Sequence, residues 1–169
     1  MSAGQETKYS EAKSAEPKYE GSKPPEARFR ECNCLAIRQA ARHVSQFYDQ
    51  LFAPIGLRAT QYAILSRLRR DGPMTINALA AALVMDRTTL GRNILPLQRD
   101  GLIEVVASPD DRRRRELRLT EIGSARHTTG IERWSFAQER FDAVFGGDRA
   151  ATLRGLLHEV VASDFAAAG

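Results

Sequence analysis

Hydrophobic positions along the chain first recur at helical spacing and then, over one short region, at every second residue. From Asn33 to Phe52, apolar residues fall three or four positions apart with charged residues between them, which predicts a long amphipathic helix that ends at the sequence APIG. A second pattern of this kind predicts a helix over residues 59–71, which ends at Asp71-Gly72-Pro73. The following MTI, residues 74–76, can pair as a small strand.

Two short helical patterns come next, over residues 77–83 and 87–100, and VMD at 84–86 separates them. Asp86 is well placed to cap the second of these helices, and Pro96, which has no N–H, is expected to kink or strain its last turn. Two helices joined by a brief turn form a helix-turn-helix, whose second helix typically enters the major groove. Its predicted solvent face carries groups that donate to phosphate oxygens or base edges: Arg87, Thr88, Thr89, Arg92 and Asn93.

After Gly101 the hydrophobic period changes to two. LIEVVA (102–107) and ELRLT (116–120) predict two strands, so the arginine run of SPDDRRRRELRLT lies at the turn between them. An isolated charge run is usually only a solvated loop, but a basic hairpin tip after a helix-turn-helix is the winged form of that motif. The arginines then face a polyanion, where each neutralised phosphate releases counterions. Asp110 and Asp111 are expected to shape the tip by accepting guanidinium hydrogen bonds across the turn.

Two further amphipathic helices are predicted, from residue 121 to about 145 and from 148 to about 164. Together with the first helix they can form a dimer interface, which would place two recognition helices on two half-sites. We therefore expect a mainly α fold with a small β-hairpin: a winged helix-turn-helix DNA-reading lobe at about 59–120, and dimerisation helices at about 32–52 and 121–165. Residues 1–30 are rich in Lys, Glu, Ser and Pro, which predicts a flexible tail before a domain at 31–169.

Composition limits the possible functions. The chain has 169 residues and a formal charge of +4, and no stretch approaches the roughly 18 apolar residues of a membrane span, so no membrane partner is expected. The N-terminal stretch has no apolar signal core, which predicts a cytoplasmic protein. Cys32 and Cys34 are too close for a useful disulfide staple and have no companion His/Cys cluster for a metal. Without a glycine-rich phosphate loop or a nucleophile and base pair, we expect neither an enzyme nor a cofactor.

These motifs resemble the MarR family of winged helix-turn-helix transcriptional regulators over residues 32–165. The resemblance rests on APIGLRATQYAIL (53–65), INALAAALVMDRTTLGRNILPLQRDGLIE (76–104) and DDRRRRELRLT (110–120). It implies a homodimer that binds a palindromic operator in double-stranded DNA and dissociates when an effector binds or a thiol is oxidised. One departure is Arg58, where the family often has Thr after Gly-Leu.

The resemblance also assigns roles to single residues. It places Asp86, Arg87, Thr88, Thr89 and Arg92 in the recognition helix. In the wing it pairs Asp111 with Arg113, which would enter the minor groove, and leaves phosphate contacts to Arg112, Arg114 and Arg115.

The effector is the second implication of the resemblance. Family members bind small ligands, often aromatic carboxylates, where the DNA-reading lobe meets the dimerisation helices. Arginines can hold a carboxylate or phosphate and aromatic residues can hold a ring, which makes candidates of Arg38, Arg42, His43, Phe47, Tyr48, Tyr62 and Trp134. Aromatic residues at helical spacing are also ordinary core residues. Regulators with a first helix similar to LAIRQAAR control aromatic compound catabolism, so we expect a repressor released by an aromatic acid or acyl-CoA-type effector.

The alternative is a peroxide-sensing repressor that uses a thiol. Cys34 lies twenty residues before Pro54, where that branch of the family has its reactive cysteine, and Tyr48 matches a tyrosine that hydrogen-bonds the thiolate. The second tyrosine of that branch falls on Ala59, and no cysteine beyond the first helix is present to resolve an oxidised thiol. A free cysteine is also commonly a small buried apolar residue.

Overall fold

The computed structural model describes residues 31–111 and 113–165. The chain divides into two units between Arg38 and Gln39, and each is described by itself. The first contributes the start of a long helix, and the second contains the helix-turn-helix, the hairpin and the last two helices. The predicted flexible tail, residues 1–30, lies outside the described residues.

The helices of the first half confirm the predicted ones to within one or two residues. They are α2 (Asn33–Phe52), the short 3-10 helix η2 (Ala53–Ile55), α3 (Ala59–Asp71), α4 (Ile76–Ala82) and α5 (Arg87–Arg99). The turn after η2 needs a left-handed residue, and Gly56 supplies it with φ of +70°. α5 continues past Pro96 to Arg99. Because Pro96 is in the last turn, only the carbonyl of Arg92 loses an intrahelical donor.

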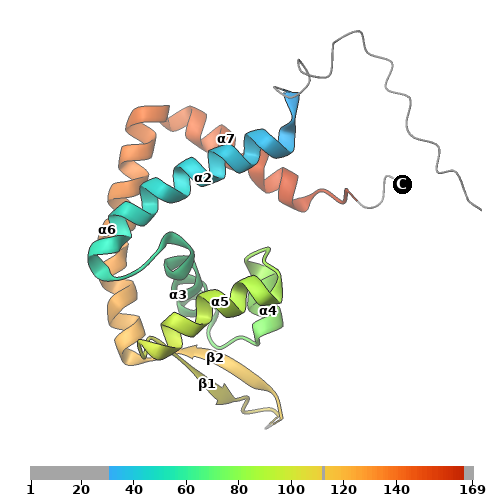
Figure 1. Cartoon of the computed structure of the whole chain (residues 1–169), viewed down its shortest axis with the longest axis vertical. Coiled ribbons are helices and arrows are strands. Elements are labelled where there is room, and N and C mark those ends of the chain that lie inside the picture. Colours follow the sequence, from blue (N-terminus) through green and yellow to red (C-terminus); the bar gives the residue numbers. More distant parts are fainter. Residues whose placement is uncertain (1–30, 112, 166–169) are drawn as a thin grey trace, which may run out of the picture. The chain divides into compact units, whose positions relative to one another are not determined.

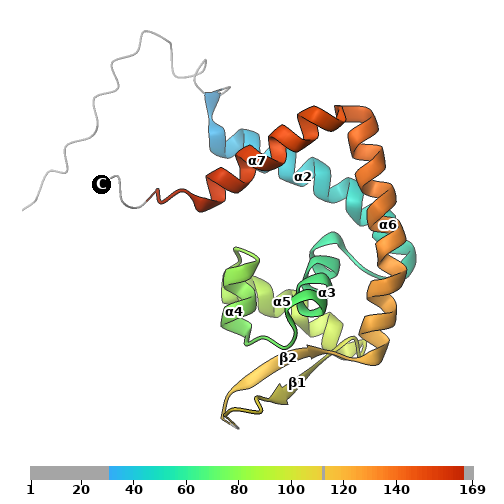
Figure 2. The same cartoon turned by 180° about the vertical axis from the view of Figure 1, so that it is seen from behind.

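The hairpin follows α5 directly. Its strands β1 (Ile103–Ala107) and β2 (Arg115–Leu119) are antiparallel, in a register that pairs Ile103 with Leu119. The predicted strand at 74–76 is wrong as a strand, because the structure has only an isolated bridge between Met74 and Leu117 there. Figures 1 and 2 both show the hairpin extending away from α6, with its turn at the far end.

The last two helices also match their predicted positions, as α6 (Glu121–Phe145) and α7 (Gly147–Ala162). Thr120 caps α6: its Oγ1 accepts the N–H of Gly123 at 3.0 Å and donates to the carbonyl of Gly101 at 2.7 Å. This cap joins the end of β2 to the turn that precedes β1.

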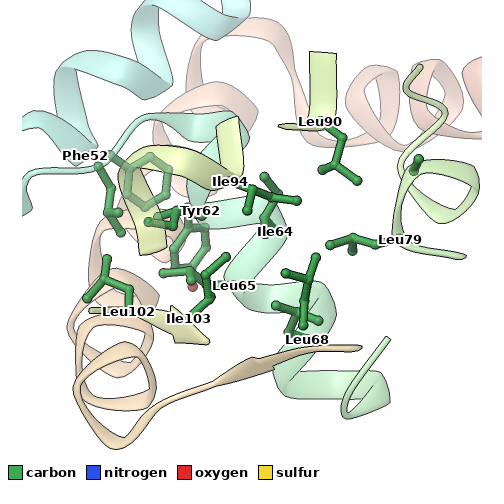
Figure 3. Packing of buried hydrophobic residues seen from close by; sticks show 14 residues of the cluster. Phe52, Tyr62, Ile64, Leu65, Leu68, Leu79, Leu90, Ile94, Leu102 and Ile103 are labelled. Atoms are coloured by element: carbon green, nitrogen blue, oxygen red, sulfur yellow. The ribbon is translucent and has the colours of Figure 1, made fainter. Parts of the chain in front are cut away.

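A hydrophobic core joins the helix-turn-helix to the hairpin (Figure 3). Helices α3 and α5 face each other through side chains that are almost completely buried, and α2, α4, β1 and β2 contribute further members of the cluster. Its fully or nearly fully buried members include Ile64, Leu65, Leu79, Leu90, Leu97, Leu102 and Ile103. Burial of each such side chain stabilises the fold by about 1.5–3 kcal/mol. The core therefore fixes α5 relative to the wing.

The last helices differ sharply from this core. Within α7 only Ala150 is buried, whereas Leu156 and Val161 are 54% and 62% exposed. On α6, Phe136 and Val144 are 56% and 74% exposed. The predicted dimerisation helices thus keep large uncovered apolar faces. None of the helices in the described ranges is long and apolar enough to cross a membrane.

Candidate nucleic-acid interface and adjoining cavities

The N-terminus of α5 is held by side chains that the sequence offered as DNA contacts. Asp86 caps the helix: one carboxylate oxygen accepts the N–H of Thr89 at 2.8 Å and the other accepts its hydroxyl at 2.5 Å. These hydrogen bonds from Thr89 lower the pKa of Asp86. Asn93 donates its side-chain amide to the carbonyl of Thr89 at 2.9 Å. Asp86, Thr89 and Asn93 therefore position the recognition helix.

The other three predicted residues of α5 are exposed and unengaged. Within the described parts of the chain, Arg87, Thr88 and Arg92 form no side-chain hydrogen bond or ion pair. Thr88 and Arg92 are one helical turn apart, so they share a face. This face offers a guanidinium group and a hydroxyl to phosphate oxygens and base edges, and Arg87 adds a second guanidinium group at the start of the helix.

The turn before α5 contains a strained residue that the sequence analysis did not single out. Val84 has φ of +52° and a side chain that is 72% exposed. The left-handed region is unfavourable for a β-branched residue, and glycine or asparagine is the usual occupant. The strain lies beside the cap of the recognition helix.

Asp111 shapes the wing tip, but by a different contact from the one expected. Its carboxylate accepts the backbone N–H of Arg113 at 2.9 Å, and its carbonyl accepts the N–H of Arg114 at 2.9 Å. The N–H of Ser108 donates to the carbonyl of Arg114 at 2.8 Å and closes the turn. Asp111 and Arg113 are thus in contact, but through the backbone N–H of Arg113 and not through its guanidinium group. Asp110 is exposed.

The wing arginines fall into two groups. Arg114 lies 3.4 Å from the carboxylate of the largely buried Glu116, and on the strands Arg118 lies 2.8 Å from Glu104. Arg113 and Arg115 are exposed, and among the described residues neither guanidinium has an acidic partner. Arg112 lies outside the described residues. Arg113 and Arg115 are therefore the wing side chains available to a polyanion.

Two cavities divide the effector candidates between them. The aromatic cavity, of about 450 Å³, lies between α2, α3 and α6 and is lined by Tyr48, Phe52, Ala59, Tyr62, Ala63, Ser66, Arg67, Arg70, Leu83 and Trp134. The α2–α6 groove, of about 510 Å³, is lined by His43, Val44, Gln46, Phe47, Gln50, Arg140, Phe141, Val144 and Phe145. Arg42 is exposed and lines neither, and Arg38 is an exposed residue of the N-terminal unit.

Tyr62 forms the inner wall of the aromatic cavity. Its ring is only 7% exposed and stacks on Phe52 at 4.5 Å and on His127 at 5.3 Å between ring centroids. Burial raises the pKa of Tyr62, and burial together with the charge of Arg69 lowers the pKa of His127. Tyr62 thus belongs to the hydrophobic core and also lines the aromatic cavity.

Tyr48 lies on the opposite wall, where its hydroxyl donates to Gln138 of α6. Burial also raises the pKa of Tyr48, and the nearby charge of Asp142 contributes. Both tyrosines are therefore neutral phenols at physiological pH; the single O–H of Tyr48 is already donated to Gln138, so its oxygen can still accept a hydrogen bond from a ligand.

The charged part of the aromatic cavity was missed in the sequence. Arg67 and Arg70 line it from α3, and Asp71 lies beside both, with Nε–Oδ distances of 2.5 Å and 2.8 Å. The available signal was the spacing in SRLRRD (66–71), which places Ser66 and the two arginines within one helical turn. An arginine pair beside aromatic walls can hold an aromatic anion.

The cysteines lie at the start of α2. Cys34 is in its first turn, Cys32 precedes it, and both are exposed with free thiols. In the described ranges, no group of three or more His, Cys, Asp or Glu side chains is arranged to hold a metal ion.

Comparison with known proteins identifies the family. Residues 57–114 match the model of the MarR family. The chain is similar to the solved structure of the transcriptional regulator MosR of M. tuberculosis, with 31% identity over 80% of this chain and 99% of that one, and a TM-score of 0.68. It is also similar to the solved structure of a probable transcriptional regulator from Pseudomonas aeruginosa, with 32% identity over 79% of this chain and 99% of that one, and a TM-score of 0.66.

A curated relative gives a shorter match. The transcriptional repressor IacR of Pseudomonas putida is 26% identical over 79 residues, which are 47% of this chain and 47% of that protein. The chain thus matches about half the length of this relative but nearly the whole length of the two solved structures. It belongs to the MarR family of winged helix-turn-helix transcriptional regulators.

Proposed function

We propose that the chain is a DNA-binding repressor that binds a palindromic operator as a homodimer and is released by a small aromatic acid. The observation that carries the DNA-binding role is the pair of unengaged groups on α5 and the wing: Arg87, Thr88, Arg92, Arg113 and Arg115. A solved structure of MosR in complex with DNA, 31% identical over 76% of this chain and 98% of that one with a TM-score of 0.61, supports the same role here.

Arg113→Ala tests the wing. We expect weaker binding to every duplex and a log K against log[salt] slope reduced by about one, because one phosphate contact is lost. Arg118→Ala is the matched control, since it removes the same charge from the same hairpin but from an arginine already paired with Glu104. Equal effects of the two substitutions on the slope would contradict a specific wing contact.

The homodimer is supported by the uncovered apolar faces of α6 and α7. A monomer rarely exposes this much contiguous apolar surface, and a twofold partner would bury it. Sedimentation equilibrium of the whole chain should give twice the chain mass. Val161→Glu, on the exposed face of α7, should shift the equilibrium toward the monomer, and a monomeric wild type would contradict the proposal.

The aromatic cavity supports the effector class. Its volume of about 450 Å³ suits a one- or two-ring acid and could hold only part of an acyl-CoA thioester. Trp134 lines the cavity and is the single tryptophan of the chain, so its fluorescence reports on binding there. Benzoate should change this fluorescence saturably, and Arg67→Gln should weaken its binding while leaving that of neutral benzamide unchanged.

Thiol sensing remains the second candidate, favoured by the exposure of Cys34 in the first turn of α2. Under this alternative an organic hydroperoxide releases the protein from DNA, and reductant restores binding. Cys34→Ser should then abolish the response. Release of the Cys34→Ser variant by the same hydroperoxide would end this candidate.

A further inference from the structure

Asp71, the last residue of α3, forms ion pairs with the two arginines that line the aromatic cavity and offsets one of their two positive charges. Its Oδ2 lies 2.5 Å from Nε of Arg67, and its Oδ1 accepts a hydrogen bond of 2.8 Å from Nε of Arg70. The hydrogen bond from Arg70, together with the charge of Arg67, lowers the pKa of Asp71, so the carboxylate is ionised at neutral pH. The two arginines of the cavity lining are therefore already paired with a carboxylate of the protein, which itself lies just outside the lining.

The contact leaves Arg67 incompletely satisfied. Its buried Nε lies 2.5 Å from Oδ2 of Asp71, in a one-point contact that does not have the geometry of a well-formed hydrogen bond. A buried donor with a poorly formed hydrogen bond is unfavourable, and a guanidinium prefers a planar, two-point contact with a carboxylate. Arg67 both touches Asp71 and lines the cavity, so a carboxylate bound in the cavity can offer it the better contact.

Asp71 is also three residues away from Met74, which is hydrogen-bonded to the wing. Gly72 follows it in the left-handed region, with φ of +78°. Two residues later, Met74 exchanges two backbone hydrogen bonds with Leu117 of β2, at 3.1 Å and 2.8 Å. The next residue, Thr75, caps α4 through its hydroxyl. The chain from Asp71 therefore reaches a contact with β2 after three residues and the cap of α4 after four.

We propose that Asp71 is a resident counter-anion of the aromatic cavity: a ligand carboxylate replaces it on Arg67 and Arg70, and the freed segment 71–74 shifts the wing. This inference rests on the proposed effector role of the cavity and names the step by which the effector acts. It also assigns the ligand class, because only an anion can exchange with Asp71. A neutral ring of the same shape fills the cavity without releasing the carboxylate.

The test compares wild type with Asp71→Asn, which keeps the shape of the side chain and removes its charge. Asp100→Asn is the matched control, because Asp100 follows the last residue of α5 and pairs at 3.0 Å with the adjacent Arg99, an arginine that does not line the cavity. Benzoate and benzamide are titrated against Trp134 fluorescence, and DNA affinity is measured by anisotropy without ligand. Both variants gain the same charge, so a general charge effect appears in both.

We expect Asp71→Asn to bind benzoate on the order of fivefold more tightly than wild type, as loss of a partly exposed competing ion pair allows. Benzamide affinity should not change. Without ligand, Asp71→Asn should bind DNA about fivefold more weakly, at the lower end of typical allosteric coupling, whereas Asp100→Asn should not be weakened.

Equal benzoate affinity in wild type and Asp71→Asn would overturn the exchange while the effector class stands. Unchanged DNA affinity of Asp71→Asn would overturn the link to the wing.

The inference can also be separated from the proposed function. If benzoate binds none of the three proteins, the proposed aromatic-acid effector fails, and quenching of Trp134 then decides the exchange. Iodide, an anion, should quench Trp134 more strongly in Asp71→Asn than in wild type, because Arg67 and Arg70 lose their paired carboxylate, while neutral acrylamide quenches both equally. Equal iodide quenching in the two proteins would overturn the role of Asp71.

Discussion

The approach of α6 to the hairpin depends on Gly123, and this gives a sharp test of the fold. A Cβ at this position would lie 1.9 Å from the carbonyl oxygen of Leu102 and 2.8 Å from its carbonyl carbon. The obstacle is backbone and cannot rotate away. The N–H of Leu102 is bonded to Leu97 at 2.8 Å, and its carbonyl accepts the N–H of Thr120 at 3.2 Å. Gly123→Ala must therefore move α6 or the turn before β1.

The expected loss in the free energy of unfolding is the difference between a destabilising and a stabilising contribution. Overpacking of a rigid site costs about 1–3 kcal/mol or more, and the upper end applies where backbone is the obstacle. Alanine in place of glycine inside a helix stabilises the fold by roughly 0.5–1 kcal/mol. The free energy of unfolding of Gly123→Ala should therefore fall by about 2 kcal/mol, which corresponds to a Tm about 4–8 °C lower for a domain of this size.

Gly91 of α5 is the matched control, because a Cβ there meets nothing within 4 Å. Gly91→Ala should therefore raise the free energy of unfolding by roughly 0.5–1 kcal/mol. Urea and thermal unfolding followed by far-UV circular dichroism, at one fixed protein concentration, give both values. If Gly123→Ala were as stable as Gly91→Ala, the close approach of α6 to Leu102 would be refuted.

Three further predictions follow from the strained turn, the cap of α5 and the half-buried His127. Val84→Asn should raise Tm, because it relieves left-handed strain of about 1–2 kcal/mol at an exposed position; a lower Tm would contradict this. Asp86→Ala should lose about 1 kcal/mol of stability in denaturant titrations and weaken DNA binding, because the recognition helix loses its cap. Burial and the charge of Arg69 lower the pKa of His127 below its ordinary 6.5, so the unfolded chain takes up a proton first as the pH falls. Stability should therefore decrease between about pH 7 and pH 5.5, less so in His127→Gln, and the exposed His43→Gln should behave as wild type.

The positions of the helices and of the hairpin could be predicted from the sequence, because the ends of these elements carry local signals. Asp86 and Thr120 cap their helices through their own side chains, and the change of period after Gly101 marks the hairpin. These contacts span three residues or fewer and can be read from spacing. The strand predicted at MTI (74–76) was wrong because β-branched and apolar residues favour a strand, whereas in the structure this segment pairs only through the bridge between Met74 and Leu117.

The cavity could not be derived in the same way. Arg67 and Arg70 look like solvated charges of an amphipathic helix, and only the packing of Tyr48 and Trp134 from other helices turns them into a cavity wall. The same packing separates Phe47 from its neighbour Tyr48, which line different cavities. Adjacent helical positions point about 100° apart, but which direction meets a cavity depends on tertiary contacts.

The central claim is that an aromatic acid in the cavity releases the chain from DNA through Arg67 and Arg70. The most direct measurement is the anisotropy of a labelled duplex from the intergenic region beside the gene, bound by fully reduced protein and titrated with benzoate. The account predicts release of wild type, and no release of Arg67→Gln at the same benzoate concentration, with each protein compared with its own ligand-free DNA complex. Equal release of both proteins, or release only by a hydroperoxide, would contradict it.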